Sequence, residues 1–322
     1  MPEDYKQAIQ DYYAAAAVAA DPSLCCVDGA FWSLPGLEFP PRMLEMNYGC
    51  GSTVHPSDLS GEEPVLYVGV GGGLEALQFA YFRRRPGGVI AVDPVAEMRE
   101  AAARNLEEAA RVNAWFRSEF VRIAEGTADA LPVPGESVGV VAQNCLFNVF
   151  TEADLARALA EVERVLGIGG RFSTSDPVTT APLPEALRRN ATLRARCISG
   201  CTTYGRYLAA LHASGFQRLV VRARRPYRLL LPAEFPELGQ SVLLESLEVL
   251  AIKTGGVGPA PDVFTGRHAV YVGKDRFAVH DGNSFSAGTP VHVSDRLAAE
   301  LEPRPDFVVT APTYHARAAG CC

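Results

Sequence analysis

The sequence predicts an α/β protein built around a doubly wound, mostly parallel sheet. Strand-like and helix-like segments alternate throughout residues 64–176. A glycine-rich loop, Gly69-Val70-Gly71-Gly72-Gly73, joins the first of these strands to the following helix, and Asp93 ends the next strand. Alternating strands and helices are typical of parallel sheets that carry helices on both faces, and such sheets bind ligands at the carboxyl ends of their strands.

The elements follow from hydrophobic patterning. Short apolar and β-branched runs bounded by turn formers predict strands at residues 64–69, 89–93, 120–124, 137–143 and 171–174. Apolar residues at helical spacing predict helices at residues 3–20, 74–82, 95–114, 152–166, 183–196 and 203–214. Two further strand-like runs lie at residues 218–221 and 246–253.

From Gly255 onward glycine and proline cluster, and short β-type runs appear at residues 269–272, 278–280, 291–293 and 307–310. This change of composition indicates a small β-rich C-terminal module. We therefore expect four regions: a helical, cysteine-bearing N-terminal segment, the cofactor-binding domain, a region that completes the fold, and the module with a Cys-Cys tail. Their expected bounds are 1–60, 61–180, 181–254 and 255–322.

The overall composition excludes several classes of function. The chain has 322 residues and a formal net charge of −7, whereas nucleic-acid binding requires a basic surface. No apolar stretch reaches the roughly 18 residues that a membrane span needs. The alanine-rich run after Tyr13 lacks the basic flank of a signal peptide. We therefore expect a cytoplasmic protein that acts as a monomer, with no nucleic-acid or membrane partner.

Cysteine usage points to metal or redox chemistry. The chain has eight cysteines: Cys25, Cys26, Cys50, Cys145, Cys197, Cys201, Cys321 and Cys322. In a reducing cytosol so many thiols are not expected to form a static disulfide framework. The alternative for any single one is that it packs as a small buried hydrophobic residue.

The glycine loop predicts a nucleotide-type cofactor site. Glycines such as Gly69, Gly71 and Gly73 let the backbone approach a ligand, and the helix N-terminus behind them favours a carboxylate. Asp93 follows roughly 20 residues later, where a carboxylate accepts hydrogen bonds from ribose hydroxyls. This pair of features fits S-adenosylmethionine or NAD. Leu74 replaces the last glycine of the dinucleotide fingerprint, which favours S-adenosylmethionine.

A further stretch, residues 126–132, is similar to the adenine-contacting segment of class I methyltransferases. Thr127 stands where that segment usually has an acid, and the Ala128 N–H is positioned to reach a ring nitrogen. Pro94 and Asn144 complete the expected cofactor contacts. Tyr67 stands where many class I enzymes have an acid before the glycine loop, so the role of that acid is either lost or moved.

Three cysteine motifs carry a more specific resemblance: Asn47-Tyr48-Gly49-Cys50-Gly51, Gln143-Asn144-Cys145-Leu146-Phe147-Asn148 and Arg196-Cys197-Ile198-Ser199-Gly200. Together with Cys25-Cys26, and in this order, they resemble the arsenite S-adenosylmethionine methyltransferases. The glycine loop and the closing Cys321-Cys322 resemble a branch of that family associated with arsenosugar biosynthesis. The resemblance covers most of the chain and implies a class I methyltransferase fold with Rossmann-like topology.

The resemblance also implies the roles of the thiols. Cys145 and Cys197 would bind trivalent arsenic permanently, with Cys50 as the third ligand, because soft arsenic prefers thiolates. The arsenic lone pair would attack the cofactor methyl group. Cys26, in preference to Cys25, would form a disulfide with Cys50 and so return arsenic to the trivalent state, and glutathione or thioredoxin would then reduce that disulfide. Residues 181–254 would complete the arsenic-binding region.

Several assignments stay open at this point. Cys201 is either an extra ligand or a packing residue, and Cys321-Cys322 either captures arsenite or has no role. Tyr12 and Tyr13 either contact the cofactor, as the resemblance implies for Tyr13, or pack within the N-terminal helix. Two rival functions are a methyltransferase for another small or soft acceptor and a metalloid-binding protein without catalytic activity.

Overall fold

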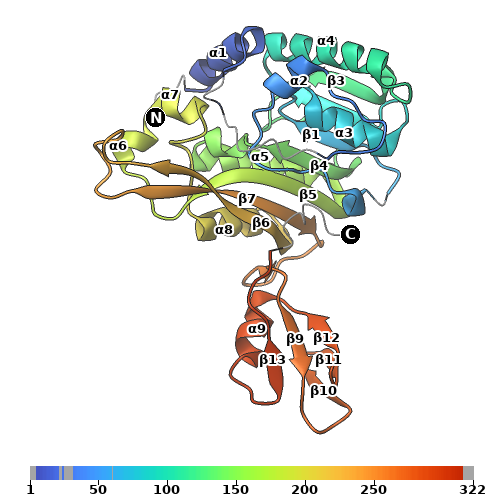
Figure 1. Cartoon of the computed structure of the whole chain (residues 1–322), viewed down its shortest axis with the longest axis vertical. Coiled ribbons are helices and arrows are strands. Elements are labelled where there is room, and N and C mark those ends of the chain that lie inside the picture. Colours follow the sequence, from blue (N-terminus) through green and yellow to red (C-terminus); the bar gives the residue numbers. More distant parts are fainter. Residues whose placement is uncertain (1–4, 22–23, 25–31, 60, 315–322) are drawn as a thin grey trace.

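The computed structural model describes residues 5–21, 24, 32–59 and 61–314. Its centre is an eight-stranded sheet in the order β3-β2-β1-β4-β5-β7-β6-β8 (Figure 1). The strands are β1 (Val65–Val68), β2 (Val89–Asp93), β3 (Val121–Glu125), β4 (Val138–Asn144), β5 (Leu166–Thr179), β6 (Phe216–Leu230), β7 (Val242–Lys253) and β8 (Asp262–Phe264). Within this sheet β7 runs antiparallel to both of its neighbours, and the other pairs are parallel. The predicted mostly parallel sheet is confirmed.

Helices cover both faces of the sheet. Helices α3 (Leu74–Arg83) and α4 (Ala96–Val112) pack on one face, while α5 (Glu152–Val165) and α8 (Tyr204–Ala213) pack on the other. Because successive side chains of a strand point to opposite faces of the sheet, each strand contributes residues to both cores. In β1, Val65 and Tyr67 enter the core under α3 and α4, whereas Leu66 and Val68 enter the core under α5 and α8.

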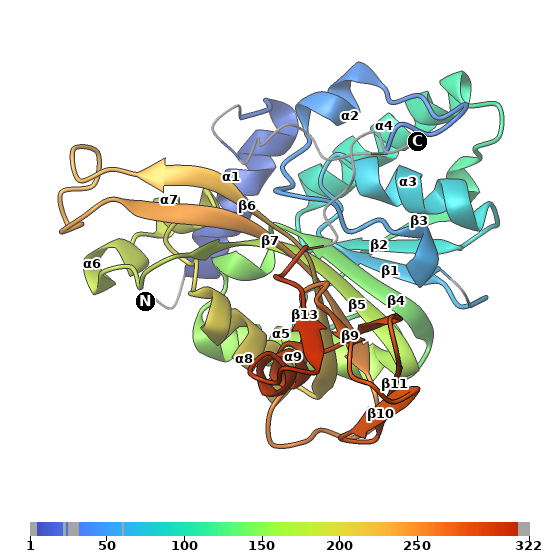
Figure 2. The same cartoon turned by 60° about the horizontal axis from the view of Figure 1, so that its bottom comes forward.

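Three strands are longer than patterning predicted. The structure extends β5 over 14 residues, β6 over 15 and β7 over 12. Figure 2 shows the β6–β7 hairpin reaching beyond the rest of the sheet. In β6 the apolar positions alternate with five arginines, so that no compact apolar run marks most of the strand.

The predicted helix at 183–196 is two short helices, α6 (Glu185–Arg188) and α7 (Ala191–Ala195). Asn190 separates them because its side chain accepts a hydrogen bond from the Leu193 N–H and thereby caps a new helix. At the other end of the chain α1 (Tyr5–Val18) lies against α7 and α4, and α2 (Pro41–Glu45) also packs on α4.

The C-terminal module has its own small core. It comprises β9 (His268–Tyr271), β10 (Phe277–His280), β11 (Asn283–Ser286), β12 (Pro290–His292), α9 (Asp295–Leu301) and β13 (Phe307–Val309). Its core gathers Tyr271, Phe285, Leu297 and Phe307, away from the main cores. Figure 1 shows it projecting from the main body. Helix α9, which patterning did not predict, is capped by Ser294.

Across the described ranges, none of the helices combines the length and apolar character that crossing a membrane would require.

Candidate functional site

A cavity lies at the carboxyl ends of β1, β2 and β4, where doubly wound sheets bind ligands. Helix α1 lies over it and contributes Lys6, Ile9, Gln10 and Tyr13 to its lining. Of the residues predicted to contact the cofactor, the ones that line it are Tyr13, Gly69, Gly71, Asp93, Pro94, Thr127, Ala128 and Asn144. Eight of the nine residues predicted to contact the cofactor, from five separate segments, thus lie at one cavity.

Gly73 is the predicted cofactor contact that does not line this cavity. It has a φ of 86° and stands at the N-cap of α3, and a Cβ atom there would lie 3.5 Å from the Leu106 side chain. Its conformation shapes the turn into the helix. Gly69 and Gly71 also have positive φ, of 83° and 53°, and both border the cavity. Their left-handed backbone explains why the loop needs glycine.

The Asp93 carboxylate braces the glycine loop from the end of β2. It accepts hydrogen bonds from the Val70 N–H at 3.1 Å and from the Val95 N–H at 2.9 Å. Burial raises the pKa of Asp93 to about 6, against the lowering effect of these hydrogen bonds. The group is therefore ionised at neutral pH and borders the cavity where a ribose would bind.

A buried acid, Glu75, lies beside Tyr67, the residue that stands where many class I enzymes have an acid before the glycine loop. This buried residue of α3 hydrogen-bonds the hydroxyl of Tyr67. Its two oxygens also accept from the N–H and the hydroxyl of Thr53, each at 2.8 Å. Burial raises the pKa of Glu75. Glu75 does not line the cavity. Its two hydrogen bonds to Thr53 hold the loop around that residue in place.

Cys50, Cys145 and Cys197 come together in one buried cluster, although they are far apart in the sequence. The Cys197 thiol donates to the carbonyl of Cys145 at 3.4 Å, and the Cys50 thiol lies 3.5 Å from the Ser175 hydroxyl. Cys145 also borders the cofactor cavity. The cluster therefore lies directly beside the predicted cofactor site.

As they stand, the three thiols do not encircle one point. Among the described residues no set of three His, Cys, Asp or Glu side chains is arranged to hold a metal ion. The reason is visible in the partners just named, because Cys197 and Cys50 each turn toward an oxygen of a neighbouring strand or loop.

The backbone at two of these cysteines is left-handed, with φ of 59° at Cys145 and 57° at Cys197. Residues with a Cβ rarely adopt this conformation, which costs free energy and is found mostly at functional sites. Each cysteine follows the end of a strand or short helix: Cys145 directly follows β4, and Cys197 lies two residues beyond α7. The turn directs both into the same cluster.

Asn144 holds the Cys50 segment with both ends of its amide. Its oxygen accepts from the Cys50 N–H and its nitrogen donates to the Gly51 carbonyl, each at 2.9 Å. The flanking glycines allow this approach: a Cβ atom on Gly49 would lie 2.5 Å from the Asn144 amide nitrogen, and one on Gly51 would lie 2.4 Å from the Ser175 hydroxyl. The motif Gly49-Cys50-Gly51 is thus explained by close backbone contact.

Sequence reasoning missed Asp176, which lies fully buried beneath the cluster in β5. It accepts hydrogen bonds from the Tyr207 hydroxyl at 2.7 Å and the Asn148 N–H at 3.3 Å. Burial raises its pKa to about 7, although the hydrogen bonds from Tyr207 and Gln143 lower it. Asn148 in turn donates to the Cys197 carbonyl at 3.4 Å. Asp176 therefore supports the loops that carry Cys145 and Cys197.

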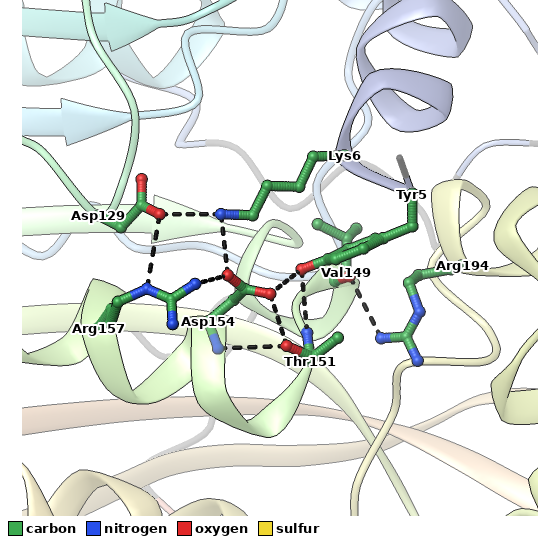
Figure 3. A network of polar contacts seen from close by, with 8 residues as sticks. All are labelled: Tyr5, Lys6, Asp129, Val149, Thr151, Asp154, Arg157 and Arg194. Atoms are coloured by element: carbon green, nitrogen blue, oxygen red, sulfur yellow. Dashed lines mark hydrogen bonds and ion pairs between the residues drawn. The ribbon is translucent and has the colours of Figure 1, made fainter. Parts of the chain in front are cut away.

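Helix α1 is fastened over the cavity by a polar network (Figure 3). Lys6 contacts Asp129 and Asp154, each at 2.9 Å, and the Tyr5 hydroxyl donates to Asp154. Thr151 caps α5 in the same network. Burial alone would raise the pKa of Asp154, but the hydrogen bonds from Lys6, Thr151 and Tyr5 lower it to about 2. The contact is therefore intact throughout the neutral range.

The remaining predicted residues have mixed outcomes. Cys25, Cys26, Cys321 and Cys322 lie outside the described residues. Cys201 is buried in a separate apolar cluster, where its thiol donates to the Cys197 carbonyl at 3.2 Å and burial raises its pKa well above the usual value. This placement favours the packing interpretation. Tyr13 borders the cavity, whereas the hydroxyl of Tyr12 bonds to Asp21.

Comparison with known proteins agrees with this site. Residues 66–174 match the family model described as a methyltransferase domain. The arsenite methyltransferase of Halobacterium salinarum is 32% identical over 177 residues, which are 55% of this chain and 43% of that protein. Residues 66–174 are therefore similar to a methyltransferase domain, and just over half of the chain is similar to an arsenite methyltransferase. Human arsenite methyltransferase is 29% identical over 167 residues, 51% of this chain and 43% of that protein.

The fold of the chain also matches a solved structure. The arsenic(III) S-adenosylmethionine methyltransferase of Chlamydomonas reinhardtii superposes with a TM-score of 0.64 at 22% identity, covering 87% of this chain and 97% of that one. At this identity the likeness concerns the fold, a class I methyltransferase sheet with added antiparallel pairing. The chain spans less than half the length of the curated relatives it matches.

Proposed function

We propose that the protein transfers a methyl group from S-adenosylmethionine to trivalent arsenic held by its thiols. The observation that carries the proposal is that Cys145 belongs both to the lining of the cofactor cavity and to the cluster with Cys50 and Cys197. A thiol-bound arsenic atom at Cys145 therefore lies next to the cofactor, which turns a bimolecular step into one within a single complex.

The side chains that line the cavity suit the chemistry of the cofactor. Asp93 offers a buried carboxylate for the ribose, and the left-handed Gly69 and Gly71 let the backbone approach the amino-acid end. Val92, Val95, Met98 and Ala128 supply apolar walls for the adenine ring. When bound, S-adenosylmethionine supplies an electrophilic methyl group. The chain orients it, and α1 excludes water through Ile9 and Tyr13.

The thiols supply the other half of the reaction. Cys145 and Cys197 hold the arsenic, and Cys50 joins them when its thiol leaves Ser175. The arsenic lone pair forms the new As–C bond as the methyl–sulfur bond breaks, so no general base is needed. Arsenic is then formally pentavalent. Two thiolates return two electrons to it by forming a disulfide, which we assign to Cys50 with Cys26 or Cys25.

A thiol reductant, glutathione or thioredoxin, completes the cycle. A thiolate of the reductant attacks the disulfide and restores both cysteines through a mixed disulfide. Cys50 suits this exchange because its segment is held by side-chain contacts from Asn144 and Ser246 and not by a strand. Cys145 and Cys197 stay bonded to the metalloid in this scheme.

Equilibrium arsenite binding tests the proposal. After gel filtration of protein with arsenite, bound arsenic is measured by mass spectrometry for the wild type and for Cys145→Ser, Cys197→Ser and Cys201→Ser. We expect the first two variants to lose at least tenfold in affinity. Cys201→Ser is the matched control, because Cys201 is equally buried but lies outside the cluster. Retention of arsenite by Cys145→Ser and Cys197→Ser would refute the thiol site.

A further inference from the structure

A second concave site lies between α5 and α8, on the sheet face opposite α3 and α4. It is a groove whose walls include Ala156 and Ala160 of α5 and Ala210 and Ala213 of α8. Because alanine side chains are short, the facing helices leave the space between them open. Within the described part of the chain the groove shares only Phe150 with the lining of the cofactor cavity, so it is a separate site.

Positive charge gathers around this groove. Arg188, Arg194 and Arg206 line it, and Glu152 is the one acidic residue in its lining among the residues that the structure describes. This balance contrasts with the whole chain, which has a formal net charge of −7. Local excess of guanidinium groups on an acidic protein favours an anionic ligand.

Arg194 is the buried member of this set, with 3% of its surface exposed. Its Nη atoms donate to the carbonyls of Val149 and Phe150, at 3.2 and 2.9 Å, and to that of Arg188 at 2.8 Å. The contact with Val149 is drawn in Figure 3. Within the described part of the chain Arg194 forms no ion pair with a carboxylate, and its Nε has no hydrogen-bond partner. A buried charge without a counter-ion is unfavourable, so a bound anion nearby stabilises it.

Arg188 and Arg206 lie at the rim and share one partner. Both contact the same Glu152 oxygen, at 3.1 and 3.4 Å, and the Glu152 side chain is 71% exposed. Ion pairs this exposed contribute little to stability. The guanidinium groups of Arg188 and Arg206 are therefore only partly neutralised by Glu152 and can also bind a ligand carboxylate.

We propose that this groove binds a small amphipathic carboxylate. Its acid group contacts Arg188 and Arg206 in the field of Arg194, and its hydrocarbon part lies along the alanine walls. Gly200 and Thr202, on the segment that follows Cys197, also line the groove. An occupant thus lies against the segment that carries Cys197. The proposal does not depend on the identity of the methyl acceptor.

Calorimetric titration of the full chain with hexanoate tests the site. We expect saturable binding of one hexanoate per chain, no detectable binding of the neutral isostere hexanamide, and weakening as ionic strength rises. Acetate should bind more weakly than hexanoate, by about twofold or more for each methylene removed from the apolar wall. Equal binding of hexanoate and hexanamide would contradict the charge argument, and absence of hexanoate binding would refute the site.

Matched variants locate the binding. Arg188→Gln and Arg206→Gln should each weaken hexanoate binding at least fivefold, and Glu152→Gln should strengthen it. Arg189→Gln is the control, because Arg189 is exposed, pairs with Glu185 and does not line the groove. Ala156→Phe should block the groove, whereas Ala153→Phe, on an exposed position of α5 outside the lining, should not. An unchanged affinity in both Arg188→Gln and Ala156→Phe would place the ligand elsewhere.

Discussion

Cys145 and Cys197 combine a buried thiol with a left-handed backbone, at φ of 59° and 57°. For residues with a Cβ this conformation costs roughly 1–2 kcal/mol. Glycine would remove the strain, yet both positions hold cysteine. The thiol is therefore kept at the expense of stability, as is typical of residues retained for function.

From the strained backbone at Cys145 we predict the order of stability of two variants. Cys145→Gly should be more stable than Cys145→Ala by about 0.5–1 kcal/mol, because the relief of strain exceeds the extra unfolded-state entropy of glycine. The order should reverse at Cys201, which does not have a positive φ. Thermal unfolding of the four variants measures both differences. An alanine variant as stable as the glycine variant at Cys145 would show that the backbone there is not strained.

The raised pKa of Asp93 leads to a prediction about how cofactor binding depends on pH. Its pKa is about 6 because the carboxyl group is buried, and the proposed contact with the ribose hydroxyls requires the ionised form. Affinity for S-adenosylmethionine should therefore be constant above about pH 7 and should fall by up to tenfold per unit below pH 6. Calorimetry across pH 5–8 checks this. Asp93→Asn should bind weakly at every pH, and a wild-type affinity that stays flat down to pH 5 would contradict the assignment.

Sequence patterns predicted residues that the structure places at one cavity and one cysteine cluster, but they did not predict all of the contacts between those residues. Gly69, Gly71 and Asp93 could be predicted because their spacing reflects local backbone geometry. The double hydrogen bond from Asn144 to the Cys50 segment could not, because it joins positions 94 residues apart. Asp176 was missed because it follows Ser173, Thr174 and Ser175 in a polar stretch that gives no sign of burial, and only its buried contact with Tyr207 marks it.

Helix α1 is the element that closes the cofactor cavity. Its inner side contributes Ile9 and Tyr13 to the lining, and its first turn is fixed by Tyr5 and Lys6. The docking network is anchored on Asp154 at the start of α5. The position of α1 therefore depends on a few polar contacts at one end and apolar contacts along its length.

Removing the lysine tests this dependence. Lys6→Met should weaken cofactor binding by about two- to fivefold, since partly exposed ion pairs contribute up to about 1 kcal/mol. Arg157→Met is the matched control: Arg157 contacts the same Asp129 and Asp154 but belongs to α5. It should leave the affinity within twofold. Calorimetric titration with S-adenosylmethionine compares the two variants, and equal losses in both would mean that the network does not act through α1.

Among the elements, those with local signals were predicted and those that depend on distant partners were not. β2 was placed at residues 89–93, its observed bounds, because it is a compact apolar run. The long strands β6 and β7 pair with each other over most of their length. Because of this pairing, the segments that contain charged residues also keep strand geometry. The break at Asn190 depends on a side-chain cap that patterning does not detect.

The whole molecule consists of a large sheet domain and a module that touches it at few points. The module has a separate core, and the chain returns from it through Tyr314, which packs against the main core and hydrogen-bonds Arg224. Among the residues that the structure describes, none that lines the cofactor cavity comes from the module. The module is therefore expected to contribute little to cofactor binding.

Truncation after Thr265 should leave the affinity for S-adenosylmethionine within twofold of the full chain. The melting temperature should fall by a few degrees, because the Tyr314 contact is lost. Full-length Tyr314→Ala serves as the control and should reproduce most of that fall. A truncated chain that folds but binds the cofactor tenfold more weakly would show that the module supports the site.

The most direct measurement at the molecular scale is separation of arsenic species after the protein is incubated with arsenite, glutathione and methyl-labelled S-adenosylmethionine. We predict that the label appears on methylated arsenic with the wild type and with Cys201→Ser, and that it does not with Cys145→Ser. Labelled cofactor bound by the wild type without any label reaching arsenic would contradict the account.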